Sequence, residues 1–174
     1  LIVLTHSHLD YIGGLDSLKE AVDAPIMMSR IEYNLLLDHS DDAFPTGRIG
    51  RLIRKLSENP NNQTPEVTFE MPDILVEADY DLSEFGYLAE ALLTPGHTNG
   101  SLSILTSEGD AIIGDSLMAM LPWSGPGKPI LASDISEIKE SMESLIQAGA
   151  KMFYLSHGDS YSLPRIKGAL ELLN

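Results

Sequence analysis

Residues 1–14 read LIVLTHSHLDYIGG, an apolar run that ends in two histidines and an aspartate. A short aliphatic and β-branched run is typical of a strand buried on both faces. Side chains two apart on an extended segment point to the same side, so His6, His8 and Asp10 converge on one point if the backbone stays extended past the strand. Imidazole nitrogens and carboxylate oxygens are donors that Zn²⁺ accepts. One histidine alone would favour an ordinary interior residue, but this spacing favours a metal site.

The following segments alternate between helix and strand patterns. Residues 13–22 place apolar side chains on one helical face, and residues 24–29, APIMMS, are typical of a second buried strand. Ser29 and Glu32 have the spacing of a capping box, which predicts a helix from there to about Leu37.

A further helix is predicted over residues 48–56. Its apolar positions follow the i, i+3, i+4, i+7 spacing, and its basic residues lie off that stripe: Ile49, Leu52, Ile53 and Leu56 against Arg48, Arg51, Arg54 and Lys55. No other segment concentrates so many basic residues. A solvated helix face is the favoured interpretation, and a clamp for an anionic substrate is the alternative.

From the segment NPNNQTPE at residues 59–66 onward the pattern becomes mostly that of strands. Short apolar runs at 73–78, 87–93, 101–107 and 111–115 are separated by turn residues, with a hairpin turn expected at SEGD, 107–110. A helix over 134–149, a strand over 151–156 and a final helix around 164–173 complete the order. Residues 1–174 therefore predict one domain of the α/β or α+β class, with helices covering layered sheets.

Three more candidate ligands follow predicted strands. His97 lies in the turn TPGHTNG, Asp115 ends the run AIIGD, and His157 follows the run MFYLS. Strand ends gather reactive groups because the scaffold fixes them while substrate still reaches them. The remaining histidine, His39, lies in an acidic loop and is interpreted as a surface residue.

As an ordered set, THSHLDYIGG, LLTPGHTNGSLSIL, AIIGDSLM and LSHGD resemble the metallo-β-lactamase superfamily of hydrolases. The resemblance covers nearly the whole chain and implies an αβ/βα four-layer sandwich. It also implies a ligand set: His6, His8 and His97 for one zinc, Asp10 and His157 for a second, and Asp115 between them. One or two zinc ions per chain are expected, with manganese or iron as alternatives.

The sequence departs from the family pattern at two places. The usual H-x-H-x-D-H motif has Tyr11 at its last position, and a neutral phenol is a poor zinc ligand, so a weaker second site is expected. Tyr11 could instead donate its hydroxyl to a substrate oxygen or serve in packing. The strands that precede the motif in the family are missing, which predicts an exposed sheet edge and an N-terminally incomplete domain.

The resemblance implies hydrolysis of a small ester, lactone or thioester, or a β-lactam-like compound, by a metal-activated hydroxide, with Asp10 orienting or deprotonating the nucleophile and Tyr11 as a helper. Apolar residues after Asp115, namely Met118, Met120, Leu121 and Trp123, are candidates for a pocket wall or for the core. A non-catalytic metal-binding module of the same fold is the alternative.

The motif GDSL at residues 114–117 suggests a third interpretation, a serine esterase that uses Ser116 as its nucleophile. Such esterases place an aspartate three residues before the catalytic histidine, and Tyr154 stands there relative to His157. The catalytic pair is therefore broken, which ranks this reading below the metal site.

Composition narrows the partners and the chemistry. A formal charge of −15 disfavours nucleic acid and anionic membranes, and the absence of cysteine excludes disulfides, thiolate ligands and a thiol nucleophile. A small-molecule substrate is the expected partner, and a homodimer is the alternative to a monomer. No membrane span or signal peptide is visible, and the compartment is left open with the cytoplasm as the default.

Overall fold

The structure is a computed structural model, and it describes residues 1–38, 40–57, 71–121 and 123–173. Two predicted features, the turn-rich segment 59–66 and the surface position of His39, lie outside these described residues. In the described part the strands form three sheets, of three, six and two strands.

The three-stranded sheet comes from the first half of the chain. It has the order β1-β2-β4, with both pairs parallel, and comprises β1 (Ile2–Val3), β2 (Ile26–Ser29) and β4 (Ile74–Val76). Helices α1 (Leu9–Ile12), α2 (Leu15–Val22) and α3 (Arg30–Leu37) follow its strands. The predicted strand at 73–78 therefore belongs to this sheet, because β4 pairs with β2 in parallel.

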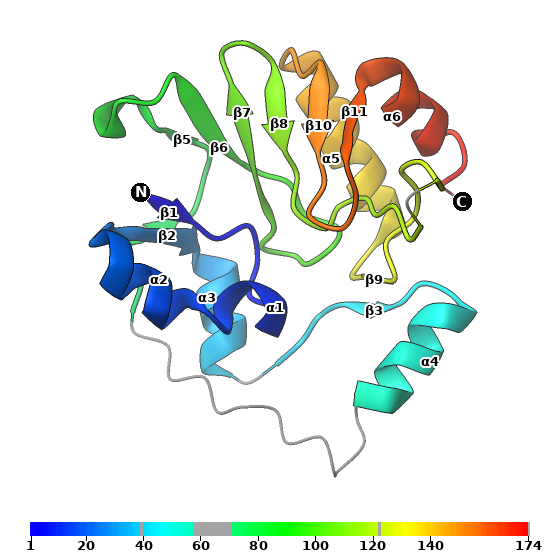
Figure 1. Ribbon diagram of the computed structural model, residues 1–174, viewed down its shortest axis with the longest axis horizontal. Helices are drawn as coiled ribbons and strands as arrows, with labels where there is room; N and C mark the ends of the chain where they lie inside the picture. The colour runs from blue at the N-terminus through cyan, green and yellow to red at the C-terminus, as the bar shows by residue number, and fades with distance from the viewer. Residues whose placement is uncertain (39, 58–70, 122, 174) are drawn as a thin grey trace.

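The six-stranded sheet has the order β11-β10-β8-β7-β6-β5. Its members are β5 (Tyr80–Asp81), β6 (Ala89–Leu93), β7 (Leu102–Thr106), β8 (Asp110–Ile112), β10 (Met152–Tyr154) and β11 (Ser160–Ser162), with the short helix η1 (Ser83–Phe85) between β5 and β6. The predicted hairpin turn is present, since β7 and β8 pair antiparallel and Gly109 adopts a φ of +95° at the turn. Helices α5 (Ile135–Gln147) and α6 (Leu163–Leu170) lie along this sheet (Figure 1).

Three apolar clusters hold these layers together. Met28 points to the helices α1–α3, whereas its neighbour Met27 points to the other sheet, where it packs with Leu102 of β7. This alternation is the period of two expected of a strand covered on both faces. On the far side of the six-stranded sheet Phe153 packs with Ile138 and the rest of α5 and α6. The order helix, sheet, sheet, helix is the predicted αβ/βα sandwich.

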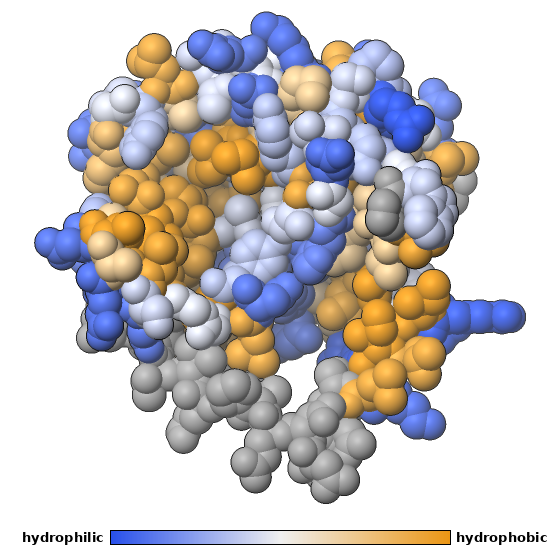
Figure 2. Space-filling view, in the orientation of Figure 1, coloured by the Kyte–Doolittle hydropathy of each residue, from blue (hydrophilic) through white to orange (hydrophobic). Residues whose placement is uncertain are grey.

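A separate arm projects beside the sandwich. It consists of β3 (Phe44–Pro45), which pairs with β9 (Leu131–Ala132), and of α4 (Arg48–Ser57) (Figure 1). The predicted helix is present, but its apolar stripe is exposed: Ile49, Leu52, Ile53 and Leu56 keep 40–60% of their surface. Figure 2 shows these apolar atoms at the surface of α4, at the lower right of the view. Periodicity identified the helix correctly, but it could not show whether another element covers the stripe.

Candidate metal centre

Four of the predicted ligands come together in one buried group, here called the histidine cluster: His6, His8, His97 and Asp115. One ligand atom from each lies within 4.8 Å of the others. His6 and His8 follow β1, His97 lies between β6 and β7, and Asp115 follows β8. The cluster therefore lies where strands of the three-stranded and the six-stranded sheets end.

On each imidazole of the histidine cluster, the nitrogen that faces away from the other rings lies near a protein oxygen. His97 donates from Nδ1 to the Leu131 carbonyl at 2.9 Å, and His6 Nδ1 lies 3.1 Å from Thr5 Oγ1. The remaining ring, His8, has its Nε2 atom 3.5 Å from the Asp41 carboxylate. Outer contacts of this kind fix the orientation of metal-ligating histidines.

The inner nitrogens of the three rings converge on one small space. His97 Nε2 lies 3.2 Å from His8 Nδ1, and both point to the same space. Among the described residues, three buried side-chain atoms lack a hydrogen bond, and two of them are the inner His6 Nε2 and the outer His8 Nε2, which only lies within ion-pair distance of Asp41. Unsatisfied buried polar atoms are costly, and a cation at the centre would satisfy the converging nitrogens. The residues present therefore fit a divalent metal ion.

Burial keeps two of these rings in the form that a metal needs. It lowers the pKa of His97 to about 4, with help from the neighbouring His8, and it lowers the pKa of His6 further still. Burial also pushes the pKa of His8 down, but the nearby carboxylates, Asp41 foremost, outweigh it and raise that pKa. Burial raises the pKa of Asp115. Neutral imidazoles are the ligand form, so the site is prepared for a cation.

Asp10 and His157 meet on the exposed side of Asp115, and these three residues are here called the exposed cluster. His157 Nε2 lies 3.2 Å from Asp10 Oδ2 and 3.5 Å from Asp115 Oδ2. The expectation that Asp10 converges with His6 and His8 through an extended backbone is wrong, because α1 begins at Leu9 and ends the two-residue alternation. Asp10 is turned instead towards His157.

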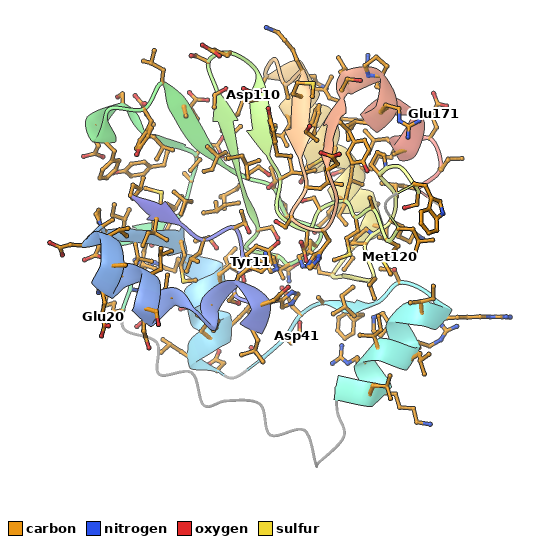
Figure 3. All side chains as sticks on the ribbon, viewed as in Figure 1. Tyr11, Glu20, Asp41, Asp110, Met120 and Glu171 are labelled. Atoms are coloured by element: carbon orange, nitrogen blue, oxygen red, sulfur yellow. The ribbon has the colours of Figure 1, made fainter. Side chains whose placement is uncertain are left out.

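Tyr11, on α1 (Figure 3), contacts Asp115, which belongs to both clusters, and His6 of the histidine cluster. Its hydroxyl donates to Asp115 Oδ1 at 2.6 Å, and its ring lies 4.0 Å from the ring of His6. Burial raises the pKa of Tyr11, and the hydrogen bond to Asp115 raises it further, so the phenol stays a donor. The hydroxyl is therefore committed to a protein carboxylate and does not line the cavity described below.

Glu32 connects the two loops that carry the histidines, a role that the sequence did not reveal. The carboxylate of this fully buried residue accepts hydrogen bonds from Ser7 N at 2.8 Å and from Ser7 Oγ at 2.7 Å. Its other oxygen accepts from Thr98 Oγ1 at 2.5 Å. One half of the predicted capping box is present, because Ser29 Oγ accepts from Glu32 N. The other half is not formed, because the Glu32 carboxylate bonds to Ser7 and Thr98.

A cavity of about 620 Å³ opens over both clusters. Its walls combine apolar side chains from α3, α4, the segment at β9 and the turn after β8 with acidic groups: Leu35, Leu36, Ile53, Met118, Ile130 and Leu131, and Asp41 and Asp42. Of the four residues considered for a pocket wall or for the core, Met118 is buried and lines the cavity, whereas Met120, Leu121 and Trp123 are exposed.

None of the basic residues of α4 lines this cavity. Arg54 instead donates to the Ala43 carbonyl at 2.8 Å and lies over the ring of Phe44. Arg48, Arg51 and Lys55 are exposed, so the arrangement favours the solvated helix face over an anion clamp.

No helix among the described residues has the length and apolar content needed to cross a bilayer.

Comparisons with known proteins agree on one superfamily. Residues 1–157 match the family model described as the metallo-beta-lactamase superfamily. The probable metallo-hydrolase YqgX of Bacillus subtilis (strain 168) is 32% identical over 117 residues, which are 67% of this chain and 48% of YqgX. The chain thus spans about half the length of this curated relative.

Solved structures show the same fold. An archaeal metallo-beta-lactamase superfamily protein, ST1585 from Sulfolobus tokodaii, superposes with a TM-score of 0.69 at 22% identity, covering 98% of this chain and 66% of ST1585. TTHA1623 in a di-iron-bound form superposes with a TM-score of 0.62 at 19% identity, covering 97% of this chain and 74% of TTHA1623.

Proposed function

Since the chain belongs to the metallo-β-lactamase superfamily, we propose that it is a metal-dependent hydrolase whose ion is held by the histidine cluster. The observation that carries this proposal is the convergence of three anchored imidazoles, two of them kept neutral by burial. Zinc suits a donor set of imidazole and carboxylate without thiolate, and iron or manganese would accept it too. The di-iron form of TTHA1623 supports keeping iron among the candidates.

When bound, a divalent ion supplies an acidified water as nucleophile and polarises the carbonyl that is attacked. The chain's own residues handle the proton. Asp10 lines the cavity and is about half exposed, so its carboxylate can take a proton from the attacking water and return it to the leaving group. His157, 3.2 Å away, orients that carboxylate.

For the substrate we propose a small neutral ester, lactone or thioester, with β-lactam-like compounds in the same class. The apolar walls formed by residues such as Leu36, Ile53 and Met118 suit an uncharged acyl or ring group. Asp41 and Asp42 in the cavity wall, together with the formal charge of −15, disfavour phosphorylated substrates.

The serine esterase alternative receives no support from the surroundings of Ser116. This side chain is buried, and within the described ranges it makes no hydrogen bond to a histidine. A serine without a general base is a weak nucleophile.

The test combines metal analysis with a panel of chromogenic ester, lactone, thioester and β-lactam substrates. We expect hydrolysis of at least one substrate class, loss of roughly 100-fold or more on chelation, the same loss in His97→Ala, and little change in Ser116→Ala. Full activity without metal, together with loss in Ser116→Ala, would establish the serine route. A metal-loaded protein inert towards the whole panel would favour the non-catalytic module.

A further inference from the structure

Tyr11 forms a hydrogen bond with one oxygen of Asp115. The phenolic hydroxyl donates to Oδ1 at 2.6 Å, a short bond between part-buried groups. The ring is fixed by its contact with His6, with ring centroids 4.0 Å apart and planes inclined by 54°. Tyr11 also belongs to the apolar layer under α1 and α2, so its position is set by packing as well.

The other oxygen, Oδ2, then faces both clusters at once. It lies 3.9 Å from Nε2 of both His6 and His97, and 3.5 Å from Nε2 of His157. A carboxylate held this way presents a single oxygen to cations on either side. Rotation that would offer both oxygens to one cluster requires the bond to Tyr11 to break.

The two clusters differ in what else they offer. The histidine cluster has three imidazoles, each held on its outer nitrogen and largely shielded from water. The exposed cluster has one imidazole and two carboxylates, and the side chains of Asp10 and His157 are 55% and 50% exposed. Among the described residues no further histidine, aspartate or glutamate completes it. Fewer and less constrained donors give weaker binding.

We propose that Tyr11 is a positioning residue that makes the two clusters unequal, holding Asp115 in one-oxygen coordination while giving the exposed cluster no ligand. The chain accordingly retains one ion tightly in the histidine cluster and a second one weakly. This inference rests on the proposed metal-dependent function, because it concerns the same centre.

The experiment is a titration of chelator-treated protein with Zn²⁺ against a chromophoric competitor, which reports the affinity and number of sites independently of catalysis. We expect the wild type to bind one equivalent at least roughly 100-fold more tightly than the second. Tyr11→His adds an imidazole beside Asp115, and the second equivalent should then tighten by roughly tenfold or more.

Tyr11→Phe isolates the hydroxyl while keeping the ring. Asp115 is then free to rotate, so the visible spectrum of the Co²⁺-substituted histidine cluster should change, although the second equivalent stays weak. Tyr33→Phe, in the same apolar layer, is the matched control and should leave both the spectrum and the affinities unchanged. Thermal melting establishes that each variant is folded.

The proposal is overturned if folded wild type binds two equivalents with affinities within tenfold of each other. It is also overturned if Tyr11→His leaves the second equivalent as weak as before, or if Tyr11→Phe has the wild-type Co²⁺ spectrum. Failure of the proposed function is a different result: no metal bound at the histidine cluster, or activity that survives chelation.

Discussion

Glu32 accepts a hydrogen bond from Thr98, 66 residues away, at 2.5 Å between two buried side chains. Through Ser7 the same carboxylate holds the loop between His6 and His8, and through Thr98 it holds the loop of His97. A buried carboxylate is tolerated when its oxygens accept hydrogen bonds. Removing its charge leaves the donor groups around it without a full partner, which lowers the free energy of unfolding. The relative placement of the three imidazoles thus depends on one side chain that touches none of them.

Glu32→Gln should therefore lower both stability and metal affinity. The amide keeps the shape of the side chain but presents a donor to a Ser7 or Thr98 donor, so we expect a loss of about 2 kcal/mol in the free energy of unfolding. Urea unfolding of the metal-free protein measures it. Glu20→Gln, on the exposed side of α2, is the control and should change stability by less than about 0.5 kcal/mol. Equal stability of the two variants would refute the role given to Glu32.

Gly96 lets the His97 loop approach α5 more closely than any side chain allows. Its φ is +128°, and an added Cβ would lie 2.3 Å from the backbone nitrogen of Ile138. Gly96→Ala should destabilise the protein by about 3 kcal/mol, since strain and overlap add. Gly168→Ala, in the middle of α6 with open space around it, should stabilise by about 0.5–1 kcal/mol. Melting curves of the two variants should shift in opposite directions, and a shared direction would contradict the packing argument.

The metal-free protein should lose stability as the pH falls. Burial lowers the pKa of His97 from 6.5 to about 4, so between these values the unfolded chain binds more protons than the folded one. His97 alone then removes up to about 3 kcal/mol as the pH drops through this window. His6 acts in the same direction, and His8, whose pKa is raised, acts against them.

Melting of chelator-treated protein between pH 7.5 and 4.5 measures this effect. In His97→Asn the slope of melting temperature against pH should flatten, because one buried histidine no longer titrates. A slope that matches the wild type would show that acid instability arises elsewhere.

Asp41→Asn should weaken metal binding without unfolding the chain. Asp41 lies 3.5 Å from His8 Nε2, on the segment that leads to β3, and Figure 3 shows it beneath Tyr11. Loss of an outer carboxylate partner typically costs about tenfold or more in metal affinity. Asp16→Asn, exposed on α2, is the matched control for charge. Competition titration with Zn²⁺ compares the two, and equal affinities would mean that Asp41 does not position His8.

The helices and longer strands could be predicted because their signals are local. The spacing of apolar residues over 134–149 matches the face that α5 buries through Ile138, Met142 and Leu145. Strands of two residues, such as β3 and β9, have no such pattern and exist because of their partner. For the same reason the parallel pairing of β4 with β2, 47 residues apart in register, was missed.

The candidate ligands could be predicted because donor residues at strand ends are visible in the sequence, whereas their division into two clusters followed from the family resemblance and not from the spacing of the residues. Asp10 belongs to the exposed cluster because α1 starts one residue before it. Asp41 and Glu32 escaped notice because their roles depend on contacts across the fold. Acidic residues in a loop and at a helix start have no local mark of such a role.

The pairing of Asp10 with His157 joins residues 147 positions apart, and this separation governs the order of events as the chain folds. Contacts between distant residues carry a large loop-closure entropy and form slowly. We therefore expect the exposed cluster to assemble late in folding, after the sheets have brought residues 10 and 157 together. An ion bound there stabilises the folded state once it has formed, but it does not accelerate folding.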